Sequence, residues 1–171
     1  MTITGTIWKY GDDVNTDAIF PGRHTYRLMS EEEMGAHALE DFDPEFHARG
    51  AAGDIIVAGK NWGCGSAREQ AVKALRARGV AALVAKGFSR IYYRNALNEG
   101  LLTIVCPAAV DAVKNGETMT IDLGAGVITA GGKTFPFPPY PEFVRGLIED
   151  GGLVPHVKKK LAAQGKIDPA Q

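Results

Sequence analysis

The chain has 171 residues, with 19 Lys and Arg against 20 Asp and Glu and a formal net charge of −1. This length suits one domain with a sizeable core. The near-neutral charge gives no reason to expect nucleic acid or an anionic membrane as a partner. The two cysteines are too few for a disulfide framework or for the ligands of an iron–sulfur cluster.

No membrane or secretory segment is predicted. The longest apolar stretches, such as Val80–Ala85, fall far short of the ~20 residues that a membrane-spanning helix needs. Met1–Tyr10 lacks the basic start and the apolar run of a secretory signal. We therefore expect a cytoplasmic protein.

The first forty residues predict a strand, a polar loop and a helix, in that order. The strand is expected at Ile3–Lys9 and the loop at Gly11–Asp17. The helix is expected at Ser30–Glu40, because Ser30 and Glu33 have the spacing of a capping box.

Three apolar strands alternate with two helices in the middle of the chain. The strands are predicted at Asp54–Ala58, Val80–Ala85 and Leu102–Cys106, and the helices from Ser66 to Gly79 and from Phe88 to Leu101. Ser89 is the expected N-cap of the second helix. This alternation predicts an α/β layer with parallel strands.

The C-terminal third differs, because short strands there are joined by glycine turns. They are predicted at Met119–Leu123, Val127–Ala130 and Lys133–Phe135, as an antiparallel element. The proline-rich stretch Phe135–Pro141 cannot be a central strand. A short helix is expected at Phe143–Glu149, followed by a solvated end after Pro155. One compact α/β domain is therefore predicted.

The glycine-rich stretch Gly59–Glu69, GKNWGCGSARE, is the first candidate site. Glycines between a strand and a helix let the backbone approach a ligand, and the helix start favours a carboxylate or a phosphate. Arg68 can bind a carboxylate, and Ser66 can act as a base if its pKa is lowered. Alternatively, Ser66 and Glu69 form only a capping box. Cys64 is either a reactive thiol or a cysteine without a catalytic role.

Two further stretches carry candidate residues. In Gly11–Arg27 the acidic residues alternate somewhat as in a calcium loop but lack its glycine and closing glutamate, and the cations that follow suit either an anion site or a solvated loop. In Phe88–Leu101, Arg90, Arg94 and Asn98 share one helix face, for which we expect a solvated surface at Arg90. The remaining histidines are scattered and have no metal-ligand spacing; they are His37, His47 and His156.

Three stretches together resemble a known family. GDDVNTDAIFPGR, GKNWGCGSAREQA and FSRIYYRNALNEGLL, in this order, are similar to the small subunit of 3-isopropylmalate dehydratase, the swivelling domain of the aconitase superfamily. The resemblance spans roughly residues 3–161 and leaves a tail at 162–171. It implies a single domain of the swivelling β/β/α type.

The resemblance also implies a division of labour between two chains. A large subunit is expected to carry a [4Fe–4S] cluster, to pair with this chain as a heterodimer or heterotetramer, and to dehydrate a small 2-alkylmalate. This chain is expected to bind no metal or cofactor. By the family's motif, Ser66 is the general base and Arg68 binds a substrate carboxylate. Further substrate contacts are expected from Gly65, Ala67, Arg23, Thr25, Tyr26 and Arg27.

The sequence departs from the family pattern at two places. Ala67 stands where many members have a second serine, and the loop from Arg23 to Arg27 lacks their Tyr-Leu pair. The expected substrate is 3-isopropylmalate, on the route to leucine. The alternatives are 2-methylmalate, 2,3-dimethylmalate and homoaconitate, and beyond them a non-catalytic anion-binding module or a thiol enzyme that uses Cys64.

Overall fold

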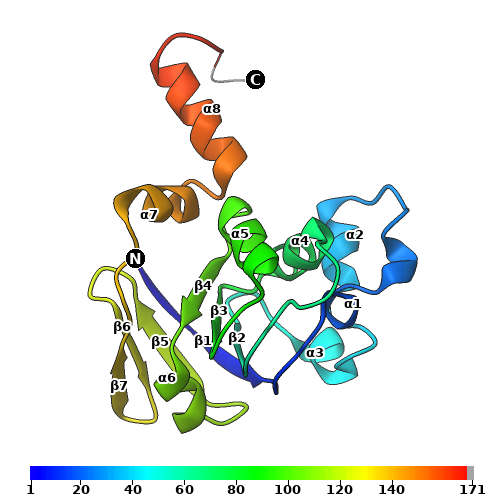
Figure 1. Ribbon diagram of the computed structural model, residues 1–171, viewed down its shortest axis with the longest axis vertical. Coiled ribbons are helices and arrows are strands. Elements are labelled where there is room, and N and C mark those ends of the chain that lie inside the picture. Colours follow the sequence, from blue (N-terminus) through cyan, green and yellow to red (C-terminus); the bar gives the residue numbers. More distant parts are fainter. Residues whose placement is uncertain (169–171) are drawn as a thin grey trace.

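A computed structural model describes residues 1–168 of the chain (Figure 1). The last part of the expected tail, 169–171, lies outside the described residues. The strands are β1 (Thr2–Lys9), β2 (Ile55–Ala58), β3 (Ala82–Ala85), β4 (Leu102–Val105), β5 (Thr118–Asp122), β6 (Val127–Ala130) and β7 (Lys133–Pro136). The helices are α1 (Thr16–Ile19), α2 (Glu31–Ala36), α3 (Pro44–Arg49), α4 (Glu69–Ala77), α5 (Arg90–Asn98), α6 (Pro107–Ala112), α7 (Glu142–Glu149) and α8 (Leu153–Ala163), with a 3-10 turn η1 at Gly22–His24.

One seven-stranded sheet organises the molecule, in the order β4-β3-β2-β1-β5-β6-β7. Strands β1 to β4 pair in parallel, for example Ile7 with Ile55, whereas β5 pairs antiparallel with β1 and begins the β5-β6-β7 meander. The α/β layer and the antiparallel element that the sequence predicts are therefore both confirmed. They meet at β1. Strand β7, which ends at Pro136, lies at the edge of the sheet, where a proline costs no ladder hydrogen bond.

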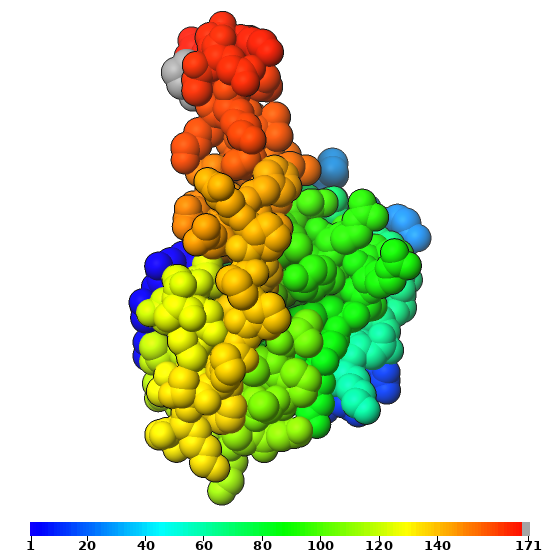
Figure 2. Space-filling view, turned by 60° about the vertical axis from the view of Figure 1, so that its left-hand side comes forward, coloured from blue at the N-terminus to red at the C-terminus, as the bar shows by residue number. Residues whose placement is uncertain are grey.

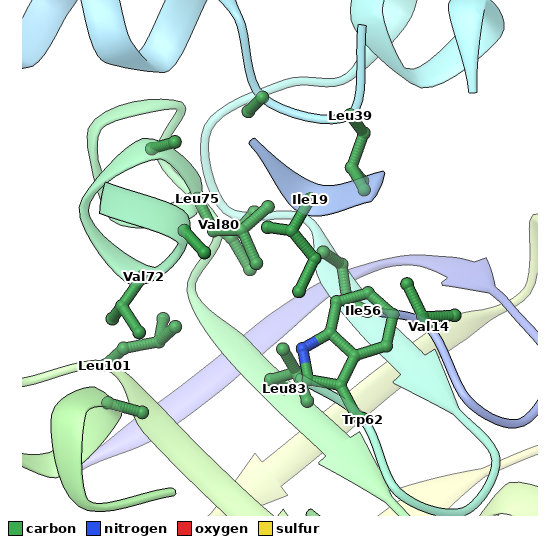
Figure 3. Close-up of a cluster of buried hydrophobic side chains, with 14 of the residues drawn as sticks. Val14, Ile19, Leu39, Ile56, Trp62, Val72, Leu75, Val80, Leu83 and Leu101 are labelled. Carbon is green, nitrogen blue, oxygen red and sulfur yellow. The ribbon is translucent and has the colours of Figure 1, made fainter. Parts of the chain in front are cut away.

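The parallel strands are apolar throughout because both of their faces are covered. In β2, Ile56 faces a core that includes Leu75 of α4, and Ile55 faces a second core that includes Val110 of α6. Every residue of β2 and β3 is buried. Figure 3 shows the first core, in which the indole ring of Trp62 lies among aliphatic side chains. The glycine-rich loop is thus anchored in the core by Trp62.

Two predicted helices are confirmed with their caps. Ser30 and Glu33 form the expected capping box, although α2 ends at Ala36 rather than at Glu40. Ser89 caps α5 as expected. The short helices α1, α3 and α6 were not predicted from the sequence, because four to six residues carry too little periodicity to be distinguished from a turn.

The end after Pro155 is solvated, as the sequence predicts, but most of it is helical, which the sequence did not predict. Residues Leu153–Ala163 form α8, which has no buried residue and projects from the body of the molecule (Figures 1 and 2). Pro155 lies in the first turn, where a missing backbone N–H costs no intrahelical hydrogen bond. Among the described residues, no helix is long and apolar enough to cross a membrane.

Candidate active site

The glycine-rich loop between β2 and α4 is held by backbone hydrogen bonds to two other loops. On one side, the N–H of Gly63 donates to the carbonyl of Val14 at 2.8 Å, and the N–H of Thr16 donates to the carbonyl of Cys64 at 2.9 Å. On the other side, the N–H of Ser89 donates to the carbonyl of Trp62 at 2.9 Å. The loop therefore has one defined conformation although it has no regular secondary structure.

The N-terminal loop uses its acidic residues for this attachment. The Oδ1 of Asp12 accepts a hydrogen bond from the N–H of Lys60 at 2.7 Å, and the Oδ1 of Asp13 accepts one from Asn61 at 2.8 Å. Asn15 caps α1, since its side chain accepts from the N–H of Ala18. These side chains have structural partners, which explains the calcium-like alternation without a calcium ion.

Ser66 is exposed beyond the last glycine of the loop, and it is not a helix cap. Helix α4 begins at Glu69 rather than at Ser66, and its N-cap residue, Arg68, makes no side-chain capping hydrogen bond. Glu69 instead lies 3.2 Å from Lys73. The capping-box alternative is therefore wrong. The carbonyl of Ser66 accepts hydrogen bonds from Thr16 Oγ1 and from the N–H of Arg68, and these bonds keep Ser66, Ala67 and Arg68 in the loop rather than in the helix. The hydroxyl of Ser66 makes no hydrogen bond to another described residue.

Arg68 is oriented by Asp17 of α1. Its Nη1 lies 2.6 Å from Asp17 Oδ1, and the Arg68 side chain is only 19% exposed. This contact lacks hydrogen-bond geometry, so Nη1 is buried without a hydrogen-bond partner in the described part of the chain. A guanidinium has five N–H donors. Arg68 therefore keeps donors for a carboxylate beside Ser66.

A pocket of about 560 Å³ lies between this loop and the start of α5. The loop contributes Gly65, Ser66, Ala67 and Arg68, which the sequence predicted as one site. The opposite wall includes Arg90 and Arg94 of α5, which belong to the third candidate stretch, Phe88–Leu101, where the sequence favoured a solvated face at Arg90. Their i, i+4 spacing was visible in the sequence, but nothing local indicated that this face lies against the glycine-rich loop.

Hydrogen bonds of Ser89 join the two walls of the pocket. Ser89 Oγ donates to the carbonyl of Gly63 at 2.6 Å and accepts from the N–H of Tyr92, so one side chain both fixes the loop and starts α5. Tyr92 is buried beneath the pocket, and its burial raises the pKa of its phenol well above the ordinary range. Tyr92 is therefore neutral and cannot serve as a base.

The other predicted contacts lie outside this pocket. Arg23 pairs with Glu40 and Asp41, and Thr25, Tyr26 and Arg27 follow in the turn after η1. Tyr26 is 97% exposed, and none of these four residues lines the pocket. Only Gly22, which begins this segment, reaches the site: a Cβ there would lie 3.3 Å from Arg68 Nη1.

A cluster of two histidines and a glutamate was missed by the sequence reasoning. His24 and His37 bond to different oxygens of Glu40, at 2.6 and 2.5 Å, and their ligand atoms lie within 4.8 Å of one another. The two rings are stacked, with centroids 3.9 Å apart and planes 18° apart. Lone pairs in two nearly parallel planes do not converge on one metal ion, so this geometry favours hydrogen bonding to Glu40. The His37-x-x-Glu40 spacing was the only local signal for it.

Comparisons with known proteins agree with this arrangement of fold and site. The sequence model of the family described as the aconitase C-terminal domain matches residues 15–109, which include both pocket walls. The class of the protein is therefore an aconitase-type domain.

Relatives along the whole chain are more specific. The 3-isopropylmalate dehydratase small subunit of Syntrophus aciditrophicus is 46% identical over 94% of this chain and 98% of its own length. The methanogen homoaconitase small subunit of Methanothermobacter thermautotrophicus is 45% identical over 93% of this chain and 92% of its own length. The crystal structure of a 3-isopropylmalate dehydratase from Methanocaldococcus jannaschii superposes with a TM-score of 0.90 at 41% identity, covering 97% of this chain and 99% of that one. The chain belongs to the family of 3-isopropylmalate dehydratase small subunits.

Proposed function

We propose that this chain is the small subunit of a hydro-lyase that interconverts 3-isopropylmalate and 2-isopropylmalate by removing and re-adding water. The observation that carries the proposal is the placement of Ser66 and Arg68 on one loop at the wall of a pocket. A serine hydroxyl that bonds to no other described residue and a guanidinium with free donors are the groups that proton transfer next to a carboxylate requires.

The chemistry assigned to this chain has two parts. Ser66 Oγ takes the proton from the carbon next to a carboxylate, and Arg68 binds that carboxylate as negative charge develops on it. The backbone N–H groups of Ser66 and Ala67 donate to no acceptor among the described residues, so they can stabilise the same charge. Arg68 and the N-terminus of α4 both favour the ionised form of Ser66.

The residues of this chain do not fit an iron–sulfur cluster. Cys106 is buried with its Sγ 3.9 Å from the carbonyl of Pro136, and the Sγ of Cys64 donates to the carbonyl of Asp13 at 3.4 Å. We therefore place the [4Fe–4S] cluster of the family on a large subunit, joined with this chain in a heterodimer or heterotetramer. The steps derived for this chain are limited to proton transfer and carboxylate binding.

Replacement of Ser66 tests the proposal directly. In the reconstituted pair, Ser66→Ala is expected to lower kcat for 3-isopropylmalate by roughly 10²–10⁴-fold, the usual contribution of a general base. Co-elution with the large subunit is expected to be unchanged. Ser30→Ala, which removes an exposed serine at the start of α2, is the matched control and should keep the kcat of the parent pair. Normal turnover by Ser66→Ala would refute the assignment of the base.

The homoaconitase relative makes an extended tricarboxylate the second candidate substrate. Such a substrate needs one more cation, but Arg23 of the η1 segment already pairs with Glu40 and Asp41. This pairing argues against Arg23 as that cation. Comparison of kcat/KM for 3-isopropylmalate, 2-methylmalate, 2,3-dimethylmalate and homoaconitate tests which of these substrates the enzyme prefers. Contacts from Thr25, Tyr26 and Arg27 stay a prediction, as does a cytoplasmic location.

A further inference from the structure

Four apolar residues of the projecting helix α8 form a stripe on one of its sides. Their spacing of i, i+1, i+4 and i+8 falls within an arc of about 100° on a helix of 3.6 residues per turn. The stripe consists of Leu153, Val154, Val157 and Leu161, and the first three are 36%, 65% and 42% exposed. Figure 2 shows that α8 stands clear of the body. An exposed apolar stripe with polar borders marks a contact with another chain.

The borders of the stripe are basic, and an acidic surface lies beside it. Lys158 and Lys160 flank the stripe on its two sides. Next to α8, a groove of about 590 Å³ has Glu142 and Glu149 on its α7 wall, together with one cation, Arg145. The two carboxylates make no hydrogen bond or ion pair to another described residue. The exposed side of α8 is therefore apolar and basic, and α7 offers carboxylates close to it.

Helix α8 lies at the end of α5 that is opposite to the catalytic pocket. Its N-cap, Gly152, lies against the C-terminal end of α5, since a Cβ there would be 2.7 Å from the carbonyl oxygen of Asn98. The pocket is lined instead by the first turns of α5, from Arg90 to Asn95. A large subunit that meets Ser66 covers the pocket end of α5. The stripe at the other end is therefore left for a different partner.

We propose that α8 is the docking surface for a second copy of this chain, with the two helices packed antiparallel about a two-fold axis at Val157. Leu153 of one copy then faces Leu161 of the other, so both stripes are buried. The same register places Lys160 opposite Val154 of the other copy rather than opposite another lysine. A parallel pair would set the lysines side by side.

Two further charge effects favour the antiparallel pair. The basic C-terminal half of each α8 lies beside the base of the other α8, where α7 carries Glu142 and Glu149. The dipoles of the two helices also run in opposite directions, which is the favourable arrangement. The choice of a second copy rests on the proposed function, because it assumes that the large subunit occupies the pocket end. Two such pairs of subunits would form a heterotetramer.

Sedimentation velocity of the full chain over a concentration series tests the contact. The parent is expected to reach twice the 18.3 kDa of one chain. The double variant Val154→Gln, Val157→Gln should raise the dissociation constant of the dimer at least about tenfold, because apolar contacts are lost in both copies. Ala163→Gln adds the same amide to α8 outside the stripe and should leave that constant unchanged. Since α8 has no buried residue, urea unfolding of the body should be the same in all three.

Cross-linking tests the position of the axis. Val157→Cys and Ala163→Cys are compared, both with Cys64→Ser so that this partly exposed thiol does not react, whereas Cys106 is buried. A short bismaleimide should join two copies at position 157, which lies at the axis. It should not join them at position 163, because these residues are about 18 Å apart along the antiparallel helices. Equal yields of covalent dimer at the two positions would overturn the arrangement.

Three other outcomes would refute the docking of a second copy. The first is a parent chain that stays at 18.3 kDa at every concentration. The second is a dimer that the double variant does not weaken, since the copies would then meet elsewhere. The third is a double variant that loses affinity for the large subunit while the parent chain is monomeric, because α8 would then bind the large subunit.

Activity separates this proposal from the proposed function. With the large subunit, the double variant should keep the kcat of the parent, while the mass of the complex falls to that of one large and one small subunit. An inactive parent pair would refute the proposed function, whereas an active pair with a monomeric small subunit refutes only the docking of a second copy.

Discussion

Gly63 is the residue on which the close approach of the two pocket walls depends. Its φ is +75°, and a Cβ on it would lie 2.1 Å from Cγ of Tyr92, a buried side chain of α5. No side chain fits in that distance, and L residues rarely adopt this φ. The glycine-rich loop can therefore lie on α5, with Ser66 and Arg68 opposite Arg90, only because residue 63 is glycine.

Replacement of two glycines separates the steric cost from the cost of the backbone conformation. Gly116 has a similar φ of +82° but open space around its Cβ position, so Gly116→Ala should cost about 1 kcal/mol of unfolding free energy. Gly63→Ala adds a collision with a packed ring and should cost about 3 kcal/mol or more. Urea unfolding of the isolated chain measures both. Equal losses of unfolding free energy in the two variants would show that the Tyr92 ring moves aside for the new methyl group without a further loss of stability.

At the scale of elements, Glu40 connects η1 to the turn that follows α2. Its side chain is 14% exposed and bonds to His24, His37 and Arg23. Burial of the carboxyl opposes its ionisation, but the hydrogen bonds from the two histidines and the charge of Arg23 prevail and lower the pKa of Glu40. This network holds the η1 segment, whose first residue, Gly22, lies beside the Arg68 guanidinium.

The network makes a prediction about pH. Because the folded-state pKa of Glu40 is lowered, its stabilisation is fully present above the ordinary carboxyl pKa of about 4.3 and is lost as the pH falls through the folded-state value. Glu40→Gln should therefore lower the unfolding free energy by roughly 1–3 kcal/mol at pH 7. The difference in unfolding free energy between Glu40→Gln and the parent should shrink below about pH 4.

The matched control is Glu45→Gln, which removes an exposed i, i+4 pair with Arg49. It should cost at most about 0.5 kcal/mol at pH 7. Urea unfolding across the pH range compares the two variants. If the cost of Glu40→Gln persisted undiminished at low pH, the carboxylate would not be the source of the stabilisation.

At the scale of the whole molecule, a packed body carries one projecting helix. The two cores on either face of the sheet include residues of α4, α6 and α7, whereas α8 contributes no buried residue (Figures 1 and 2). Asp150 after α7 holds α8, because its carboxylate contacts His156 at 2.7 Å and Lys159 at 2.5 Å. The bond from Lys159, followed by that from His156, lowers the pKa of Asp150.

Removal of this carboxylate should loosen α8 alone. Asp150→Asn is expected to speed amide hydrogen exchange in Leu153–Ala163 about two- to fivefold at neutral pH, with β2 and β3 unaffected. Asp111→Asn removes another short pair, with Lys86 on the body, and serves as the control. Mass spectrometry measures the exchange rates. If the exchange rate of α8 were the same in Asp150→Asn as in the parent, or rose equally in the control variant, Asp150 would not hold α8 in place.

Local patterns in the sequence carried much of the fold and one half of the site. Apolar strands, the capping box at Ser30, the N-cap at Ser89 and the glycine-rich loop are recorded in neighbouring residues, so they could be read directly. Ser66 and Arg68 could be proposed as a pair for the same reason, since they lie on one loop, and both line the same pocket. The start of α4 was misjudged, because a contact from Thr16, fifty residues away, keeps Ser66 in the loop.

By itself, then, the sequence determined the order of the strands, the family and the proposal of the serine–arginine pair, because each is written in residues adjacent along the chain. Only the tertiary structure decided that Arg90 and Arg94 line the same pocket as Ser66, that His24 and His37 share Glu40, and that Leu153–Ala163 is a helix. These features depend on which surfaces the sheet brings together. Packing between distant segments sets that choice, and no local pattern records it.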